Sequence, residues 1–185
     1  MIKKLTIPVD HGNRNMKTAH FLFTTGLSST DRKPAGREDF LQTEGKYYVL
    51  SGRRIPYQRD KTQDERFSIL TRFAIAKELE RTGQVTEEDV VQVSLPIGVP
   101  PKHYAELAER YREYFLGDGK VQELVYNGKT YHTCIRDVAV YPQAYAAMMT
   151  EGEKIRQIPK AVGIDIGGFT SDFLLMRSGA PCLDY

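Results

Sequence analysis

The stretch GIDIGGFTSD, residues 163–172, has the composition of a turn that could bind an anion. An apolar run ends at Asp165, and the chain then turns through Gly167 and Gly168 before apolar residues resume. Glycine permits unusual backbone angles and keeps side chains out of the way, so consecutive N–H groups can point at one phosphate. Two hydroxyl side chains beside the glycines would add short hydrogen-bond donors: Thr170 and Ser171.

A similar unit occurs near the N-terminus. When Asp10 is aligned with Asp165, four further positions correspond: Gly12 with Gly167, Asn13 with Gly168, Asn15 with Thr170, and Lys17 with Asp172. Apolar residues precede and follow both turns. A single Gly-Gly turn between apolar runs is usually only a tight hairpin, whereas two copies of one unit favour a shared function.

An aspartate at the head of such a turn would repel a phosphate unless a cation stood between them. Asp10 and Asp165 therefore make chemical sense together with a hydrated Mg²⁺. Two such hairpins that face each other would hold a polyphosphate from both sides, with the metal in the middle. The sequence thus predicts a phosphate clamp, by which we mean these two hairpins.

Composition limits the protein to which the clamp belongs. A chain of 185 residues suits one domain, or one domain and part of another. The first residues reach Pro8 too soon for a signal peptide, and no run is long and apolar enough to span a membrane. We therefore expect a cytoplasmic protein without membrane contact, and we interpret Cys134 and Cys182 as free thiols. The net charge of +2 gives no general basic field.

The N-terminal half alternates between expected strands and one helix. Short strands are predicted at residues 5–9 and 19–25, and we expect these two to form an N-terminal hairpin. A second hairpin is predicted to join 40–43 to 47–50. Residues 51–63 are polar and locally basic, which indicates an exposed connection and, as the less favoured alternative, a nucleic-acid contact. The basic side chains there are Arg53, Arg54, Arg59 and Lys61. Apolar residues from Phe67 to Ala74 recur at helical spacing, and Gly83 would end that helix.

The C-terminal half continues the pattern. Asp89–Pro96 is expected to be an interior strand covered on two sides, and Pro100 and Pro101 to open a helix that Gly117 closes. Asn127–Gly128 predicts a hairpin between 121–126 and 129–140. A small-residue helix is expected at 144–151, followed by a polar stretch and then the second clamp hairpin. Together these elements indicate an α/β domain with a mixed sheet.

Three motifs resemble a known family: DHGNRNMKT, VYPQAYAAM and GIDIGGFTSD. They are similar to phosphate motif one, the first connecting segment and phosphate motif two of the actin, sugar kinase and heat-shock chaperone superfamily. SLPIGVPPKHY also resembles the plasmid-partition actin-like ATPases of the ParM/StbA kind. The resemblance extends over nearly the whole chain. It implies an actin-like ATPase (ribonuclease H-like) domain at residues 1–158, with 159–185 starting an incomplete second domain.

The resemblance also implies roles for single residues. Asp10 and Asp165 would organise the water shell of Mg²⁺, and Asp165 would help to polarise the attacking water. Gln143 would orient that water, and Lys17 would reach the phosphates. The remaining nucleotide ligands implied by the motifs are Gly12, Asn13, Asn15, Gly167, Gly168, Thr170 and Ser171. A solvated strand residue remains the alternative for Lys17, and an N-terminal helix residue the alternative for Gln143.

The resemblance implies an ATPase in a longer parent protein that uses ATP or GTP with Mg²⁺. Such a parent would assemble into filaments and move plasmid or phage DNA through an adaptor protein. Because only about twenty residues follow Asp165, we expect the base-binding half to be missing and this chain alone to be inactive. A non-catalytic filament-binding or capping module is one alternative. A sugar-kinase-like phosphotransferase is the other, and Asp137 is then a candidate base, although Gln143 favours an NTPase.

Four features depart from the family pattern. Pro8 lies inside the first expected strand and removes a ladder donor, so we expect an irregular strand there. Phe169 would narrow the second turn or point outward, and His11 is interpreted as a turn residue rather than a catalytic acid. A lone terminal hairpin would expose apolar side chains at 173–175, so we expect it to pair with another copy or dock on its own domain.

Overall fold

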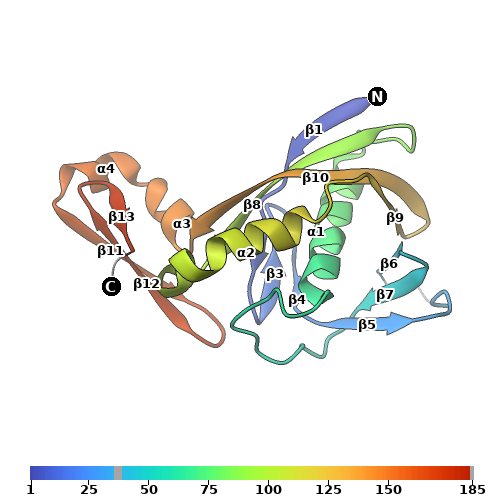
Figure 1. Ribbon diagram of the computed structural model, residues 1–185, viewed down its shortest axis with the longest axis horizontal. Coiled ribbons are helices and arrows are strands. Elements are labelled where there is room, and N and C mark those ends of the chain that lie inside the picture. The colour runs from blue at the N-terminus through green and yellow to red at the C-terminus, as the bar shows by residue number, and fades with distance from the viewer. Residues whose placement is uncertain (36–38, 184–185) are drawn as a thin grey trace.

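A mixed seven-stranded sheet forms the larger part of the molecule in the computed structural model, which describes residues 1–35 and 39–183 (Figure 1). Its strand order is β1-β8-β10-β9-β6-β7-β5. The strands are β1 (Ile2–Thr6), β5 (Leu27–Thr30), β6 (Phe40–Thr43), β7 (Lys46–Leu50), β8 (Val90–Val99), β9 (Gln122–Tyr126) and β10 (Lys129–Pro142). β1 and β10 both run parallel to β8, and the other neighbours are antiparallel. The predicted α/β class with a mixed sheet is confirmed.

Strand β8 is an interior strand between β1 and β10, as its valine-rich sequence predicts. Side chains alternate along it, with every second residue from Val91 to Val99 buried in the core. The opposite row is half-buried, so the expected cover on both sides is complete on one side only. Alternation at period two is what places one continuous apolar row on the core.

Two long helices supply the rest of that core. Helix α1 (Arg66–Thr82) ends at Gly83, whose positive φ of 61° confirms the predicted stop. Helix α2 (Tyr104–Leu116) follows the 3-10 turn η1 (Pro101–His103), and it buries Leu107, Tyr111 and Phe115. Both helices belong to the same hydrophobic cluster as β8. The predicted hairpins at 40–50 and 121–140 are also confirmed.

The expected hairpin between residues 5–9 and 19–25 is wrong. β1 pairs with β8 instead, and the hairpin is the shorter pair β2 (Asp10–His11) and β3 (Asn15–Lys17), to which β4 (Leu22–Thr24) adds a third strand. Pro8 explains the break. β1 ends at Thr6, yet the N–H groups of Ile7 and Val9 still bond to β8 at 3.0 Å, so the chain continues along β8 without a regular ladder.

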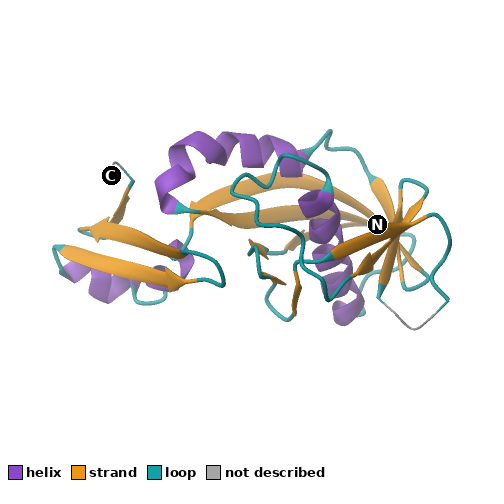
Figure 2. Cartoon of the chain, turned by 90° about the horizontal axis from the view of Figure 1, so that it is seen from below, coloured by secondary structure: helices purple, strands orange, loops and turns teal. Residues whose placement is uncertain are grey.

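The C-terminal layer consists of α3 (Tyr145–Met149), α4 (Gly152–Gln157) and a sheet of β11 (Lys160–Ile166), β12 (Ser171–Arg177) and β13 (Ala180–Cys182). It lies beyond the end of β10, with its helices on one side of its sheet (Figures 1 and 2). The stretch expected to be merely polar before β11 is therefore helical in part, at α4. The hairpin is also not alone, because β13 pairs with β12.

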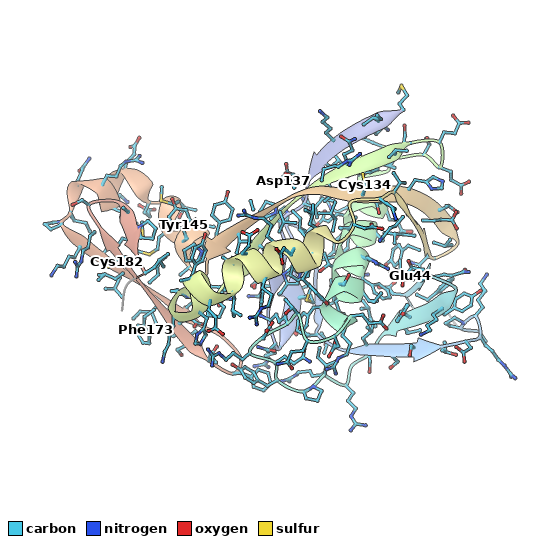
Figure 3. All side chains as sticks on the ribbon, in the orientation of Figure 1. Glu44, Cys134, Asp137, Tyr145, Phe173 and Cys182 are labelled. Carbon is cyan, nitrogen blue, oxygen red and sulfur yellow. The ribbon has the colours of Figure 1, made fainter. Side chains whose placement is uncertain are left out.

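One row of the C-terminal sheet packs against its helices. Leu174 and Met176 form a small core with Ile155, so the expected exposure of Leu174 is wrong. The other face carries Val162 and Phe173, both more than half exposed. Phe173 lies at the opposite end of the molecule from Glu44 on the β6–β7 turn (Figure 3). One face of the C-terminal sheet is thus covered by the helices of the same layer.

The connection at residues 51–65 is only partly exposed. Ile55, Gln58 and Lys61 are buried, so the prediction of a solvated loop is wrong for these residues. Cys134 and Cys182 are free thiols, as predicted. In the part of the chain that the structure describes, none of the helices combines the length and apolar character needed to cross a bilayer.

The packing of the C-terminal layer predicts unequal effects for two truncations. Leu174 is 0% exposed and Val162 is 58% exposed. We expect Leu174→Ala to lower the free energy of unfolding by about 2–4 kcal/mol because it leaves a cavity between β12 and the helices. Val162→Ala, on the open face, serves as the control and should change it by less than about 1 kcal/mol. Urea unfolding measures both, and equal losses would contradict this packing.

Candidate functional site

The two predicted hairpins line one cavity of about 390 Å³. Asp10 and Asp165 both face it, so the two acids lie on the same cavity rather than on opposite flanks. Ten of the sequence-predicted site residues line it: Asp10, Gly12, Asn13, Asn15, Lys17, Gln143, Asp165, Gly167, Gly168 and Thr170. Ser171 does not line it. That residue starts β12 and pairs with Ile166, so the prediction that it lines the turn is wrong.

The central sheet brings these residues together. β1, β8 and β10 are mutually parallel, and Asp10, Pro100 and Gln143 follow their carboxyl ends. All three residues line the cavity. Ligands of open α/β sheets commonly bind in the crevice beyond the carboxyl ends of the strands. The cavity therefore lies where this topology places a binding site.

The two hairpins have matching geometry. Asp10 pairs with Lys17 across β2–β3, and Asp165 pairs with Asp172 across β11–β12. A Cβ added to Gly12 would lie 2.5 Å from the carbonyl oxygen of Asn15, and one on Gly167 would lie 2.9 Å from that of Thr170. These pairs correspond in the sequence alignment of the two turns. The repeat that the sequence indicates is therefore present in three dimensions.

Hydrogen bonds from Thr25 and Gln58 hold the first turn in place. The buried Thr25 hydroxyl donates to the carbonyl of Gly12 at 2.6 Å, and its N–H donates to the carbonyl of Arg14 at 3.1 Å. Asn13 Oδ1 accepts the N–H of Gln58 at 3.1 Å. Asn13 lines the cavity, and an asparagine whose oxygen accepts a backbone N–H keeps its two Nδ2 donors for other partners, which suits an anionic ligand.

The second turn contacts both the first turn and the 51–65 connection. A Cβ on Gly168 would meet Arg14 Cδ at 2.5 Å, so only glycine allows this approach of the two hairpins. The Phe169 ring lies 6.0 Å from the Tyr57 ring and 5.9 Å from the Arg54 guanidinium. Phe169 therefore does not narrow the turn. It bridges the tip of the β11–β12 hairpin to the connection.

Charges of both signs face the cavity. In the described part of the chain, four cationic side chains and three carboxylates line it. The cations are Arg14, Lys17, Arg59 and Lys61, and the acids are Asp10, Asp165 and Asp172. Lys17 Nζ donates to Asp10 Oδ2 at 3.0 Å, and this hydrogen bond raises the pKa of Lys17. Burial raises the pKa of Asp172, and the Asp165 carboxylate adds to the effect. Crowded carboxylates of this kind attract a divalent cation.

Gln143 lies at the junction between the large sheet and the C-terminal layer. Its N–H donates to the carbonyl of Val99 at 2.8 Å, which extends the β8–β10 pairing by one residue. Ala144 has a positive φ of 66°, a strained conformation for alanine, so α3 begins only at Tyr145. Gln143 is thus fixed before the helix rather than within it.

Asp137 and His11 lie away from the cavity. Asp137 is exposed on β10, where it accepts a hydrogen bond from Ser94 at 3.0 Å (Figure 3). Asp137 does not line the cavity, so it is not placed to act there as the catalytic base that a sugar kinase would need. His11 is buried in β2 rather than in a turn. Its Nε2 lies 2.7 Å from Thr71 Oγ1 and its ring packs on Phe115, while burial lowers its pKa well below the ordinary value.

Sequence reasoning did not assign to the site the basic and acidic side chains of Arg14, Arg59, Lys61, His103 and Asp172, all of which line the cavity. Arg59 and Lys61 belong to the polar connection that was interpreted as solvated. The run of basic residues in this connection was the sequence signal that could have indicated a binding site there. Which of them point inward depends on contacts with distant elements, such as Tyr111 and Asn13.

The acids suit a hydrated metal ion better than one bound directly. Within residues 1–35 and 39–183, no three His, Cys, Asp or Glu side chains are grouped closely enough to hold a metal ion. Mg²⁺ keeps several of its waters in proteins and is usually held by one or two carboxylates together with substrate phosphates. Asp10 and Asp165, on one cavity with glycine turns beside them, fit that mode of binding.

A sequence profile described as "Actin like proteins N terminal domain" matches residues 9–145. Because the match spans well over half of the sequence, this chain belongs to that family of actin-like proteins. The fold and the paired hairpins thus agree with the resemblance first seen in the three motifs. No protein of curated function matches the sequence significantly.

Solved structures show the same fold. "AlfA Filament bound to AMPPNP" has a TM-score of 0.70 at 16% identity and covers 97% of this chain and 67% of its own. "Apo psk41 parM protein" has a TM-score of 0.75 at 13% identity and covers 97% and 64%. The archaeal actin homologue Ta0583 in complex with ADP has a TM-score of 0.73 at 16% identity and covers 97% and 58%. At these identities the likeness concerns the fold, and this chain spans roughly 58–67% of those proteins.

The close approach inside the first turn predicts a specific sensitivity. Because an added Cβ at Gly12 would collide with the carbonyl of Asn15, we expect Gly12→Ala to open the turn and to lower the free energy of unfolding by about 1–3 kcal/mol. Gly52→Ala is the matched control, since nothing lies within 4 Å of a Cβ there. Thermal unfolding of both variants checks this. A loss at Gly52 as large as that at Gly12 would contradict it.

Proposed function

We propose that this chain is the phosphate- and magnesium-binding N-terminal part of an actin-like ATPase that polymerises with nucleotide. Its parent would act in the cytoplasm, in the segregation of plasmid or phage DNA. One observation carries the proposal: two equivalent glycine hairpins, each headed by an aspartate, line a single cavity at the carboxyl ends of parallel strands. Residues 1–158 would be the first domain and 159–185 the start of the second.

The site residues divide the work by chemistry. The turns at Gly12 and Gly167 would present backbone donors to the phosphates, with Asn13, Asn15, Lys17, Gly168 and Thr170 beside them. Asp10 and Asp165 would hold the waters of Mg²⁺, which when bound neutralises phosphate charge. Gln143, fixed at the cavity by its backbone bond to Val99, would orient the attacking water, and Asp165 would polarise it.

The comparisons support the nucleotide and the assembly in this proposal. One structure of the same fold contains AMPPNP in a filament, and another contains ADP. We therefore propose ATP, with GTP as the alternative, and self-association of the full-length parent into filaments. Contact with DNA would be made by an adaptor protein. Since Gln143 faces the cavity and Asp137 does not, water rather than a sugar hydroxyl is the favoured acceptor.

The role of Asp165 predicts an effect that changes sign with magnesium. With Mg²⁺ and AMPPNP, Asp165→Asn should weaken binding at least about tenfold, because a carboxylate that holds metal waters is lost. With the same nucleotide and a chelator, the substitution should strengthen binding, because it removes a charge that repels phosphate. Isothermal titration of this chain measures both conditions, with Asp31→Asn on the exposed surface as the control.

A wild-type chain that binds no AMPPNP under either condition would exclude the nucleotide-binding proposal for this chain. The non-catalytic filament-binding module would then be the surviving alternative. Equal weakening by Asp165→Asn with and without Mg²⁺ would show that Asp165 acts on the fold rather than on the metal. Circular dichroism of the variant separates that case.

A further inference from the structure

Lys61 is a buried cation in the wall of the cavity. Only 3% of its surface is exposed, and its Nζ lies 5.6 Å from the centre of the Phe67 ring. Among the residues that the structure describes, no carboxylate oxygen lies within 4.0 Å of this Nζ, whereas Lys17 on the same cavity has its ion pair with Asp10. Buried ammonium groups are nearly always paired.

The backbone around Lys61 is firmly held. Its N–H donates to the Tyr111 hydroxyl at 3.1 Å, and that hydroxyl donates to the carbonyl of Arg59 at 3.3 Å. Asp60 accepts a hydrogen bond from the Arg110 side chain at 2.7 Å. The backbone of residues 59–61 is therefore fixed to α2, and from it the Lys61 side chain reaches the cavity wall. Pre-organised side chains of this kind are typical of binding sites.

The protein groups around Lys61 do not fully compensate for the cost of burying its positive charge. Burial lowers the pKa of Lys61 to about 8, and the carboxylates of Asp10 and Asp172 act in the opposite direction. His11, also facing it, is buried and neutral. The contact with Phe67 offsets only part of the cost of removing an ammonium from water. An anion in the cavity would supply the missing partner.

The two carboxylates that act on Lys61 belong to different hairpins, Asp10 to β2–β3 and Asp172 to β11–β12. Lys61 therefore lines the same cavity as both halves of the phosphate clamp. We propose that the Lys61 ammonium binds the terminal phosphate of the triphosphate and so distinguishes triphosphate from diphosphate. This inference rests on the proposed function, because it assigns a further ligand within the same site.

Inorganic tripolyphosphate and pyrophosphate, each with Mg²⁺, are suitable probes because they remove any contribution of the base. We expect Lys61→Met to weaken binding of tripolyphosphate by about 10- to 100-fold, and to weaken binding of pyrophosphate much less. Lys61→Arg should restore part of the loss because it keeps the charge. Lys4→Met, at an exposed position on β1, should bind both probes like the wild type.

Thermal unfolding separates a ligand from a structural residue. Without probe, Lys61→Met should melt at or above the wild-type temperature, since methionine fills similar space without a buried charge. Tripolyphosphate should then raise the melting temperature of the wild type but hardly that of the variant. A lower melting temperature with unchanged affinity for tripolyphosphate would overturn the inference.

The two proposals fail in different ways. If the wild-type chain binds neither probe, both the clamp and the role of Lys61 are excluded. If the wild type and Lys61→Met bind tripolyphosphate equally, the clamp remains and only the role of Lys61 is excluded. An equal loss for both probes would place Lys61 on an inner phosphate and overturn the proposed discrimination.

Discussion

The like charges that share one cavity are the constraint on which the rest of the structure depends. Asp10, Asp165 and Asp172 come from the two ends of the chain, yet they line the same space. Carboxylates brought close together repel each other, and burial adds to the cost. Among the residues that the structure describes, only Lys17 makes an ion pair with one of them. The negative charge of the other carboxylates has to be compensated by unpaired cations, by solvent or by a bound metal. This arrangement favours ligand binding over stability.

The large sheet supplies the rigidity that this arrangement requires. The long strand β10 runs beside β8 and carries the chain from the hairpin at Asn127 to the cavity at Gln143. Because β1 and β10 flank β8 in parallel, three chain segments leave the sheet at one edge. The second hairpin then reaches that edge from the C-terminal layer, which has its own small core. The cavity is therefore formed jointly by the carboxyl ends of the large-sheet strands and by the β11–β12 hairpin of the C-terminal layer.

The local parts of this design could be predicted from the sequence, and the tertiary parts could not. Asn127–Gly128 and Gly83 act through their own backbone angles, and both were predicted correctly. The pairing of β1 with β8 depends on a partner far along the chain, and the sequence pattern at residues 5–9 suited a hairpin equally well. Lys61 appeared solvated because its burial comes from α1 and α2. The correspondence between the Asp10 and Asp165 turns could be predicted because it is visible in the residue types themselves, without knowledge of which elements contact each other.

The 51–65 connection links the two halves of the cavity more directly than any regular element. Gln58 bonds to the first turn through Asn13, while Tyr57 and Arg54 contact Phe169 at the tip of the second. Lys61, from the same segment, lines the cavity that both turns share. Each contact is weak by itself, but all three depend on the same segment, which α2 holds through Tyr111. A ligand bound by Lys61 would therefore contact a segment that packs against both hairpins. Ala144, whose positive φ is strained for alanine, lies beside Gln143 where the chain passes from the large sheet to the C-terminal layer.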